Sequence, residues 1–440
     1  MMATEWPAAS SSAAKEDPTR PQPMITTCTR INLSPLGLPI METERTESKK
    51  RAFRVGEKFT TTIEKVAHGG HFIARHEGAV FFIRHGIPGE TVIVEVTSTG
   101  KSFNRGDVLE VLEPSADRVK APCSYAHRLG CGGCDFQHIS ISRQRELKSE
   151  VITEQFVRIA KMDLKVKVEE VSDPLHWRTR AILNIDGSGK AGFFGSRSHN
   201  SIQIDDCLTC VPELKLTEIA GRTWQPNTKL EVSANSSGDR TIANAGVIEG
   251  PEALLEVVGK NSFQVSHSSF WQSHKFAPEV LTDAVMQFAE LQSGDQVLDL
   301  YGGVGLFTAA ALSVVGTTGR VDLVEASSSA IGDAKINFEN VPNVNIYLGD
   351  VAKIMPRIGS ADVVILDPPR EGAGQLVLQQ ISALSPKRIV YVACDPAALA
   401  RDCAFANDLG WKLSNVRAFD LFPMTHHIEM VALFTRSAIG

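Results

Sequence analysis

Long apolar runs are missing from this sequence. No stretch of 18 or more apolar residues occurs, and the N-terminus does not show the basic and then apolar order of a signal peptide. These absences argue against a membrane span and a secretory leader, so we expect a soluble cytoplasmic protein with no membrane partner. Cysteine is also sparse, with eight residues in 440. The close spacing of Cys131 and Cys134 indicates metal binding or redox chemistry more than structural disulfides.

An excess of positive charge is missing too, because the formal net charge is -6. That value seen alone argues against a nucleic-acid partner, but it averages over the domains. Residues 51–200 carry 22 Lys and Arg against 18 Asp and Glu, whereas the rest carries 23 against 33. The asymmetry favours the N-terminal half for any contact with a polyanion.

The sequence divides into four parts. Residues 1–50 are rich in Ala, Ser, Thr and Pro and predict a disordered tail, within which Met41 is an alternative start to Met1. Short β-branched runs broken by glycine predict an OB-like barrel of about five strands over 51–114. A cysteine-bearing central domain follows over 115–255, with a helix expected over 143–159. In 256–440, apolar strands alternate with helices, which predicts a doubly wound α/β fold with a mostly parallel sheet.

A glycine-rich turn follows the first strand of the α/β region. The strand ends at Asp299-Leu300, and the turn contains Tyr301, Gly303 and Gly305. The turn does not match the dinucleotide-binding motif Gly-x-Gly-x-x-Gly, because Thr308 stands where that motif has its last glycine. Glu325 closes the next strand and is placed to accept hydrogen bonds from ribose hydroxyls. The combination favours S-adenosylmethionine (SAM) over a dinucleotide.

Two further aspartates follow later strands, where ligands of such sheets bind. Asp350 is placed to contact the adenine amino group, although an ordinary loop aspartate gives the same pattern. Asp367 begins the segment Asp-Pro-Pro-Arg, whose prolines stiffen the turn and hold a carboxylate beside a guanidinium. This segment is characteristic of methyltransferases that act on nucleobases or amides.

Cys394 and Glu429 are the candidate reacting groups. Cys394 follows the strand 389–392 and enters a proline-containing turn, so it faces the ligand crevice unless it is an inert buried thiol. Glu429 lies in an apolar strand, where a carboxyl group is costly without a partner or a task. An ordinary solvent-facing glutamate on an edge strand is the alternative.

These segments resemble the TRAM-domain, iron-sulfur-containing RNA uracil-5 methyltransferases, a bacterial family that methylates 23S rRNA. The resemblance covers about 54–436 and is carried by Gly69 to Arg75 and Val80 to Glu90, Cys131 to His138, Asp299 to Gly305, Asp367 to Arg370, Cys394 to Asp402, and Phe422 to Glu429. It implies that Cys394 attacks C6 of uracil, that Glu429 removes the C5 proton, and that SAM is contacted by Tyr301, Glu325 and Asp367. Gly303 in the turn and Asp350 after its strand complete the predicted cofactor-binding residues by their positions.

The resemblance also implies a SAM-binding glutamine and a 4Fe-4S cluster. Gln264 and Gln272 both fit the glutamine motif, and the distance to Tyr301 favours Gln272. The sequence departs from the commoner family pattern at Gly302 and His274. Spacing alone leaves zinc and a cluster open, and it leaves Cys207 and Cys210 open as the fourth ligand. The family pattern favours a structural 4Fe-4S cluster on Cys123, Cys131, Cys134 and Cys207.

Three rival functions are weighed against this interpretation. A tRNA uracil-5 methyltransferase is the nearest, but those relatives generally lack the barrel and the cluster. A non-catalytic RNA-binding scaffold is disfavoured by the intact Cys394 and Glu429, and a redox enzyme by the missing dinucleotide turn. We therefore expect a monomeric enzyme that binds RNA, specifically 23S rRNA, and not DNA.

Overall fold

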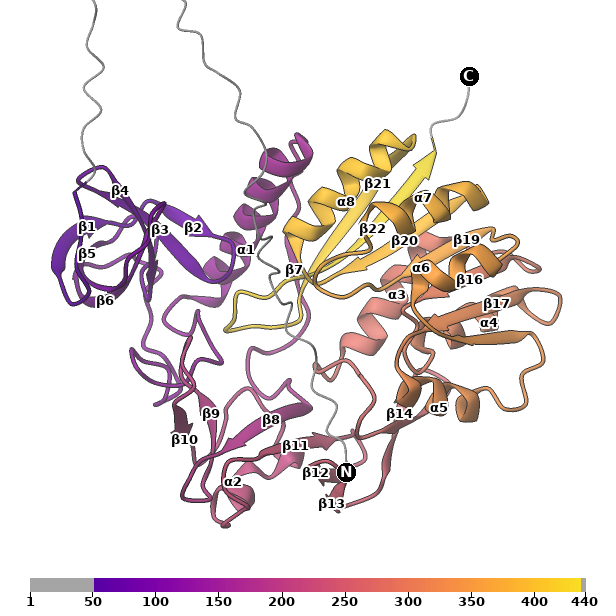
Figure 1. Cartoon of the computed structure of the whole chain (residues 1–440), viewed down its shortest axis with the longest axis horizontal. Coiled ribbons are helices and arrows are strands. Elements are labelled where there is room, and N and C mark those ends of the chain that lie inside the picture. Colours follow the sequence, from indigo (N-terminus) through magenta and orange to yellow (C-terminus); the bar gives the residue numbers. More distant parts are fainter. Residues whose placement is uncertain (1–50, 437–440) are drawn as a thin grey trace, which may run out of the picture. The chain divides into compact units, whose positions relative to one another are not determined.

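The computed structural model describes residues 51–436, which form four β-sheets and the helices around them (Figure 1). The tail predicted over 1–50 lies outside this range. Between residues 51 and 436, no helix combines the length and the apolar character needed to cross a membrane.

The N-terminal region forms one six-stranded sheet in the order β1-β5-β6-β4-β3-β2. Its strands are β1 (Lys58–Thr62), β2 (Lys65–Ala67), β3 (His71–His76), β4 (Ala79–Arg84), β5 (Thr91–Ser98) and β6 (Asn104–Glu113). About five strands were predicted, and the sheet has six. Gly69 and Gly70, with φ of 87° and 75°, turn the chain tightly between β2 and β3. Phe59, Phe72 and Phe81 fill its interior.

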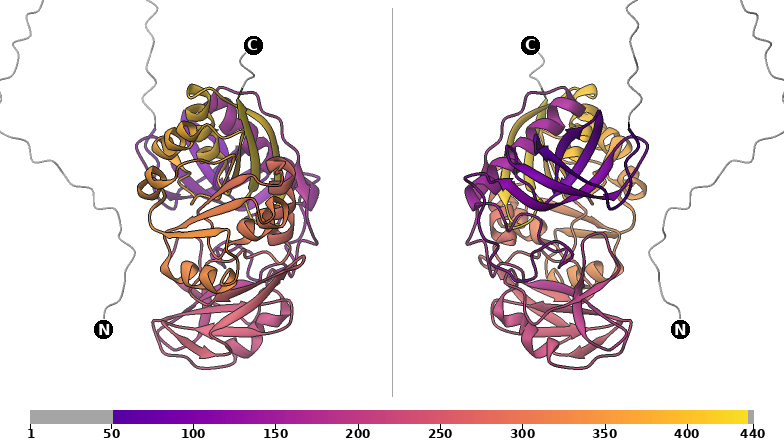
Figure 2. Two further views of the ribbon diagram at one scale, coloured as in Figure 1. Left: turned by 90° about the vertical axis from the view of Figure 1, so that its right-hand side faces the viewer. Right: turned by 90° about the vertical axis from the view of Figure 1, so that its left-hand side faces the viewer.

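The central region contains a second, antiparallel sheet in the order β10-β9-β8-β11-β12-β13, followed by a hairpin. Figure 2 shows these strands in magenta to pink. The elements are β8 (Arg180–Ile185), β9 (Ala191–Phe194), β10 (Ser201–Gln203), η2 (Pro212–Leu214), α2 (Leu216–Ala220), β11 (Lys229–Ala234), β12 (Arg240–Ala243), β13 (Val247–Glu249), β14 (Ala253–Val258) and β15 (Asn261–Ser266). Leu183, Leu230 and Ile242 lie in its core.

The C-terminal region is the predicted α/β fold, with an eight-stranded sheet in the order β18-β17-β16-β19-β20-β22-β21-β7. The strands β16 to β20 are parallel, and β22 runs antiparallel to β20. The elements are α3 (Ala277–Ala289), β16 (Gln296–Leu300), α4 (Leu306–Val315), β17 (Arg320–Glu325), α5 (Ser328–Asn337), β18 (Val344–Leu348), α6 (Val351–Ile354), η3 (Met355–Arg357), β19 (Val363–Leu366), α7 (Gly374–Leu384), β20 (Arg388–Ala393), α8 (Pro396–Asp408), β21 (Trp411–Asp420) and β22 (Glu429–Arg436).

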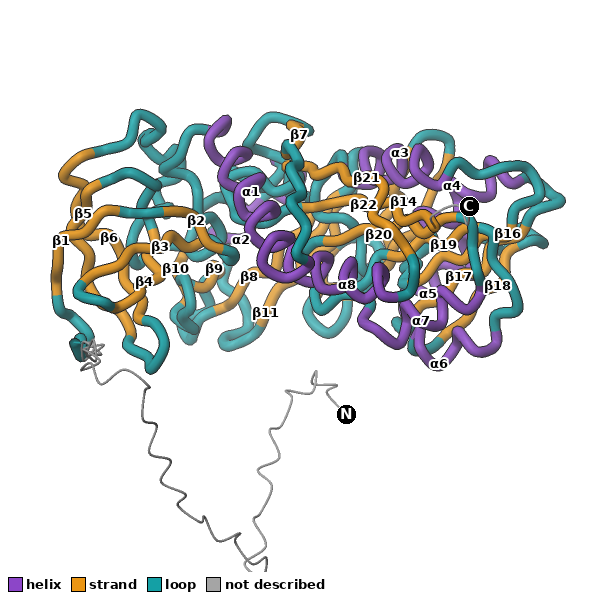
Figure 3. The backbone as a smooth tube through the Cα atoms, turned by 90° about the horizontal axis from the view of Figure 1, so that it is seen from above, coloured by secondary structure: helices purple, strands orange, loops and turns teal. Residues whose placement is uncertain are grey.

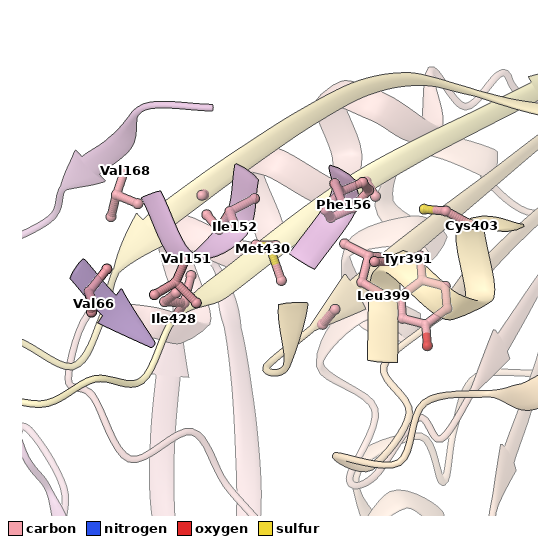
Figure 4. Close-up of a cluster of buried hydrophobic side chains, with 14 of the residues drawn as sticks. Val66, Val151, Ile152, Phe156, Val168, Tyr391, Leu399, Cys403, Ile428 and Met430 are labelled. Atoms are coloured by element: carbon pink, nitrogen blue, oxygen red, sulfur yellow. The ribbon is translucent and has the colours of Figure 1, made fainter. Parts of the chain in front are cut away.

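Part of the segment expected in the central domain belongs to this large sheet. The strand β7 (Val168–Glu170) pairs in parallel with β21. The helix α1 (Ile141–Gln155), continued by η1 (Phe156–Ala160), runs beside α8 (Figure 3). Figure 4 shows the buried side chains of this contact, among them Ile152 and Phe156 from α1 and η1 and Leu399 from α8. The predicted helix over 143–159 is therefore present, and it covers the large sheet.

Candidate active site

The carboxyl ends of the parallel strands β16 to β20 meet at one edge of the large sheet, called here the carboxyl edge. Asp299 in β16 is 1% exposed and accepts a hydrogen bond of 2.6 Å from Thr308 Oγ1 through Oδ2. Its Oδ1 has no hydrogen-bond partner among residues 51–436. Burial raises the pKa of this carboxyl to about 7, against the opposing effect of the Thr308 hydrogen bond. A buried acid with an unpartnered oxygen fits a site that receives a polar ligand.

The turn after β16 has the backbone that its glycines allow. Gly303 and Gly305 have φ of 57° and 100°, and Tyr301 also takes a positive φ of 60°. The turn is joined to β17 by Glu325, whose Oε2 accepts a bond of 3.1 Å from Gly303 N and whose Oε1 accepts one of 2.7 Å from Ser327 N. The structure therefore brings Tyr301, Gly303 and Glu325 together, as the sequence predicts for a cofactor site.

Asp350 lies at the end of the neighbouring strand β18. Its side chain caps α6 by accepting a bond of 3.2 Å from Lys353 N. Burial raises the pKa of Tyr301 to about 12, and the negative charge of Asp350 contributes to this rise. Asp350 is therefore close to the turn, and a structural role in capping exists beside the predicted contact to adenine.

The two competing glutamines occupy different places. Gln264 N donates to Asn337 Oδ1 at 2.8 Å, and the same asparagine amide donates to Val304 O at 3.1 Å, which ties the backbone of Gln264 to the glycine turn. Gln272 lines a cavity of about 380 Å³ together with His274. No hydrogen bond among the described residues joins the Gln272 side chain to the turn, so its contact with SAM stays a prediction.

His274, one of the departures from the family pattern, is a core residue. It is fully buried, stacks on Trp177 at 5.6 Å between ring centres and has Ser172 Oγ 3.0 Å from its Nε2. Burial lowers its pKa to about 4, with the charge of Lys275 adding to the effect. The His274 imidazole is therefore neutral, stacked and hydrogen-bonded, and its role is to pack the core.

Cys394 and Glu429 lie beside a paired position of two strands. In the antiparallel pair β20 and β22, Ala393 is opposite Met430, so Cys394, directly after β20, and Glu429, the first residue of β22, lie close together. Burial raises the pKa of Cys394 to about 12, and the negative charges of Glu429 and Asp367 add to the rise. Burial and the charge of Asp367 raise the pKa of Glu429 well above its ordinary value. The thiol and the carboxyl group are therefore neighbours, and the thiol carries its proton at neutral pH.

Asp367 and Arg370 complete this group. Asp367 follows β19, and its N donates to Leu300 O at 3.2 Å. Burial raises the pKa of Asp367 to about 7, and the negative charges of Asp299 and Glu325 add to this rise. The guanidinium of Arg370 is close enough to lower the pKa of both Cys394 and Glu429 against these effects. The carboxyl edge thus carries the residues predicted to bind the cofactor next to the candidate reacting residues.

The loop 421–428, which leads into Glu429, is held by residues that the sequence analysis missed. Lys148 on α1 donates to Asp420 Oδ1 at 2.6 Å and to Phe422 O at 3.0 Å, and its side chain is 1% exposed. Gln144, one turn earlier, accepts a bond of 2.8 Å from Met424 N. The sequence signal for these two residues was a polar side chain on the apolar face of a helix. A polar group buried there requires a hydrogen-bond partner.

The barrel and the loop that contains Cys131 and Cys134 both contact the segments that carry Cys394 and Glu429. His68 Nε2 is 2.8 Å from Oδ2 of Asp395, the residue after Cys394. Asp135, the residue after Cys134, has Oδ2 2.5 Å from His426 Nδ1 and Oδ1 3.1 Å from Arg84 Nη2. Side chains from three regions of the chain therefore fix the two segments that carry Cys394 and Glu429.

Two curated relatives, each named as an uncharacterized RNA methyltransferase, align with nearly the whole chain. The protein from Streptomyces avermitilis is 38% identical over 432 residues, which cover 88% of this chain and 100% of the relative. The protein from Streptomyces coelicolor is 39% identical over 433 residues, which cover 88% and 94%. The family model of tRNA (uracil-5-)-methyltransferases matches residues 357–437, and these include Asp367, Cys394 and Glu429.

The chain belongs to the RNA uracil-5 methyltransferase family. It is a SAM-dependent RNA methyltransferase, as predicted. The TRAM domain model matches residues 52–109, and the model of protein-L-isoaspartate (D-aspartate) O-methyltransferases matches 262–367, around the cofactor turn. The crystal structure of Pyrococcus abyssi tRNA (uracil-54, C5)-methyltransferase with S-adenosyl-L-homocysteine is similar with a TM-score of 0.68 and 20% identity, covering 85% of this chain and 99% of that one. This likeness shows a shared fold.

In this methyltransferase the four predicted cysteine ligands, Cys123, Cys131, Cys134 and Cys207, line one cavity of about 350 Å³ together with Arg178 and other polar and apolar residues. Cys210 is 3% exposed and lies in the core of the central sheet. A hydrogen bond with the Cys210 side chain lowers the pKa of Cys207 to about 5. No group of three or more His, Cys, Asp or Glu within 51–436 is placed to hold a metal ion, so the predicted cluster is not confirmed.

Proposed function

We propose that this methyltransferase adds a methyl group to C5 of a uracil in 23S rRNA through a covalent adduct between Cys394 and C6. The observation that supports the proposal is the pairing of Ala393 with Met430, which brings the adjacent Cys394 and Glu429 close together, beside the residues predicted to bind the cofactor. A thiol and a carboxyl group in this arrangement supply the nucleophile and the base that substitution at C5 requires.

The chemistry follows from these two groups. C5 of uracil is a weak nucleophile, so the Cys394 thiol passes its proton to solvent water and its sulfur bonds to C6, which moves the electrons of the C5=C6 bond into an enolate. When bound, SAM supplies the methyl group that C5 takes. Glu429 then accepts the C5 proton, the C5=C6 bond forms again and the C6–S bond breaks, which releases the product and Cys394.

The raised pKa of Cys394 means that its thiol must be activated before it attacks uracil. A thiol with a pKa of about 12 carries little thiolate at neutral pH, so attack requires activation when the uracil is bound. Arg370 is the nearby cation that lowers this pKa. Its guanidinium is therefore placed to stabilise the thiolate, and the negative charges of Glu429 and Asp367 oppose it.

A tRNA substrate is the second candidate, because the matching family model and the Pyrococcus abyssi enzyme are both described as acting on tRNA. That enzyme shares the fold over 85% of this chain, so overall architecture does not separate the two substrates. Mapping 5-methyluridine in rRNA and tRNA from a strain without this gene tests the choice. We expect one position in 23S rRNA to lose the methyl group and to regain it when the wild-type gene returns. If only tRNA loses 5-methyluridine, the substrate is tRNA and not 23S rRNA.

We also propose that Cys123, Cys131, Cys134 and Cys207 hold a 4Fe-4S cluster with a structural role. A zinc ion keeps its thiolates about 2.3 Å from one centre, which requires tightly gathered sulfurs. A cluster spreads four cysteines around a larger core, and a cavity of about 350 Å³ has room for one. When bound, the cluster would fix the loop 131–134, whose neighbour Phe136 donates to Met424 O at 3.0 Å in the loop before Glu429.

Protein purified without oxygen is expected to be brown and to contain iron, measured by visible absorption and elemental analysis. Cys134→Ser is expected to lose the iron and to unfold at a lower temperature, because a group bound only by the folded chain contributes its binding free energy to stability. Cys403→Ser, a change at a buried cysteine in α8 outside the cavity, is the control and should keep the iron. Stoichiometric zinc without iron would contradict the proposal.

A further inference from the structure

The turn between β2 and β3 of the barrel touches both segments that carry the candidate reacting residues. Its contact residues are His68 and Gly70, which we call the clamp. His68 and its partner Asp395 are 327 positions apart in the chain, so this contact is not part of the hairpin that the turn closes. A turn that only joined two strands of the barrel would need no partner in the α/β region.

The first contact of the clamp is on the Cys394 side. His68 Nε2 is 2.8 Å from Asp395 Oδ2. The other carboxylate oxygen, Oδ1, accepts bonds of 2.9 and 2.8 Å from the backbone N–H groups of Ala397 and Ala398, so Asp395 is also the N-cap of α8. Cys394 lies between the last residue of β20 and this cap. The sheet therefore holds its backbone on one side, and the barrel holds it on the other side through Asp395.

The second contact of the clamp is on the Glu429 side. Gly70 lies so close to the pair of His426 and Asp135 that a Cβ placed on it would be 2.8 Å from His426 Nδ1 and 3.0 Å from Asp135 Cγ. Asp135 is also tied to the barrel by Arg84, the last residue of β4, at 3.1 Å. The loop that leads into β22 therefore rests against the barrel shortly before Glu429 begins that strand.

These contacts are poorly suited to a purely stabilising role. The side chain of His68 is 39% exposed and that of His426 is 27% exposed. Partly exposed ion pairs contribute little to stability, because water and salt screen them. Small errors of position cost large factors in rate, because attack and proton transfer require the reacting atoms at defined distances. Positioning therefore explains these contacts better than stability does.

We infer that the clamp positions the reacting pair, with His68 holding the Cys394 segment for attack at C6 and Gly70 holding the Glu429 segment, through His426, for removal of the C5 proton. The inference rests on the proposed function for these two steps. It assigns the barrel a positioning role in catalysis that is separate from any contact with RNA.

The test measures the two steps separately on the full chain, with enzyme in excess, saturating 23S rRNA and methyl-tritiated SAM. One RNA is transcribed with uridine and the other with 5-fluorouridine. Fluorine at C5 cannot leave as a cation as the proton does, so the methylated adduct is trapped and its rate of formation reports the steps before Glu429 acts. With uridine, the decay of the adduct reports the step of Glu429. Rapid quenching into denaturant and gel electrophoresis follow both rates.

The two sides of the clamp should fail at different steps. His68→Ala is expected to trap the 5-fluorouridine RNA about tenfold more slowly than the wild type, without accumulating adduct on the uridine RNA. His426→Ala is expected to trap it at the wild-type rate but to release methylated uridine RNA about tenfold more slowly, so that labelled adduct accumulates. A merely structural role would lower both rates by one factor, equal to the loss of folded enzyme that calorimetry of SAM binding measures.

Gly70→Ala and Gly69→Ala form a matched pair that leaves both histidines in place. Their φ values of 75° and 87° mean that alanine strains the backbone alike at either position. At position 70 the added methyl group collides with His426, whereas at position 69 it would be 3.9 Å from His71 Nδ1, an ordinary contact distance. Gly70→Ala should therefore slow release as His426→Ala does, and Gly69→Ala should keep both wild-type rates.

The outcomes separate the clamp from the proposed function. Wild-type rates in all folded variants, or an equal fall of both rates in each, would overturn the clamp while the proposed function stands. If a histidine variant does not fold, the glycine pair decides alone. A wild-type enzyme that forms no adduct on the 5-fluorouridine RNA would overturn the proposed function, and the clamp with it.

Discussion

Cys394→Ala is expected to bind RNA and SAM but to transfer no methyl group, with a loss in rate of about 10⁴-fold or more, as removal of a nucleophile commonly produces. Without the sulfur no bond to C6 forms, and C5 never gains the electron density it needs. The side chain lies at the end of β20, and its replacement by the smaller alanine leaves the strand pairing intact. Transfer of tritium from methyl-labelled SAM to RNA measures the loss.

Cys403→Ala is the matched control for this change. Cys403 is a second thiol, 2% exposed in α8, and it contacts the core and not the carboxyl edge. Its removal should lower stability through a small cavity while leaving methyl transfer per folded molecule near the wild-type value. Residual methylation of uridine by Cys394→Ala would show that the reaction does not pass through this sulfur, even though the family assignment would stand.

The strand-end residues were predictable from the sequence because parallel strands share one edge. Once the alternation of strands and helices is recognised, Asp299, Glu325 and Asp367 must meet there, whatever the loops do. The pairing of Cys394 with Glu429 was not predictable in the same way. It depends on β22 entering the sheet antiparallel next to β20, which is a long-range choice that no local pattern encodes.

The supports of the site were the least predictable part. The strand β7 has three residues, too few to show the hydrophobic alternation of a strand. It pairs with β21, some 250 positions later in the chain. Lys148 looks like an ordinary helix surface residue until its carboxylate partner Asp420 is known. The bond between Asp135 and His426 likewise joins two loops whose approach is set by the packing of three separate regions.

Glu429→Gln is expected to attack the uracil and methylate it, and then to stall as a covalent complex of protein and RNA. Glutamine has the shape of glutamic acid and no charge. Because burial and the charge of Asp367 raise the pKa of Glu429 well above its ordinary value, this site tolerates a neutral group, and the neutral amide should keep the fold. What it cannot do is accept the C5 proton, and the C6–S bond does not break until that proton leaves.

The stalled complex should survive denaturing gel electrophoresis and carry the labelled methyl group. Cys394→Ala/Glu429→Gln is the control and should give no such band, since the bond to C6 requires the sulfur. In the wild-type enzyme the basic form of Glu429 increases as pH rises towards its raised pKa, so the release step should quicken with pH. In Glu429→Gln this dependence should disappear. A variant that turns over normally, or a band that forms without the methyl group, would mean that another residue removes the proton or that the glutamate acts before methyl transfer.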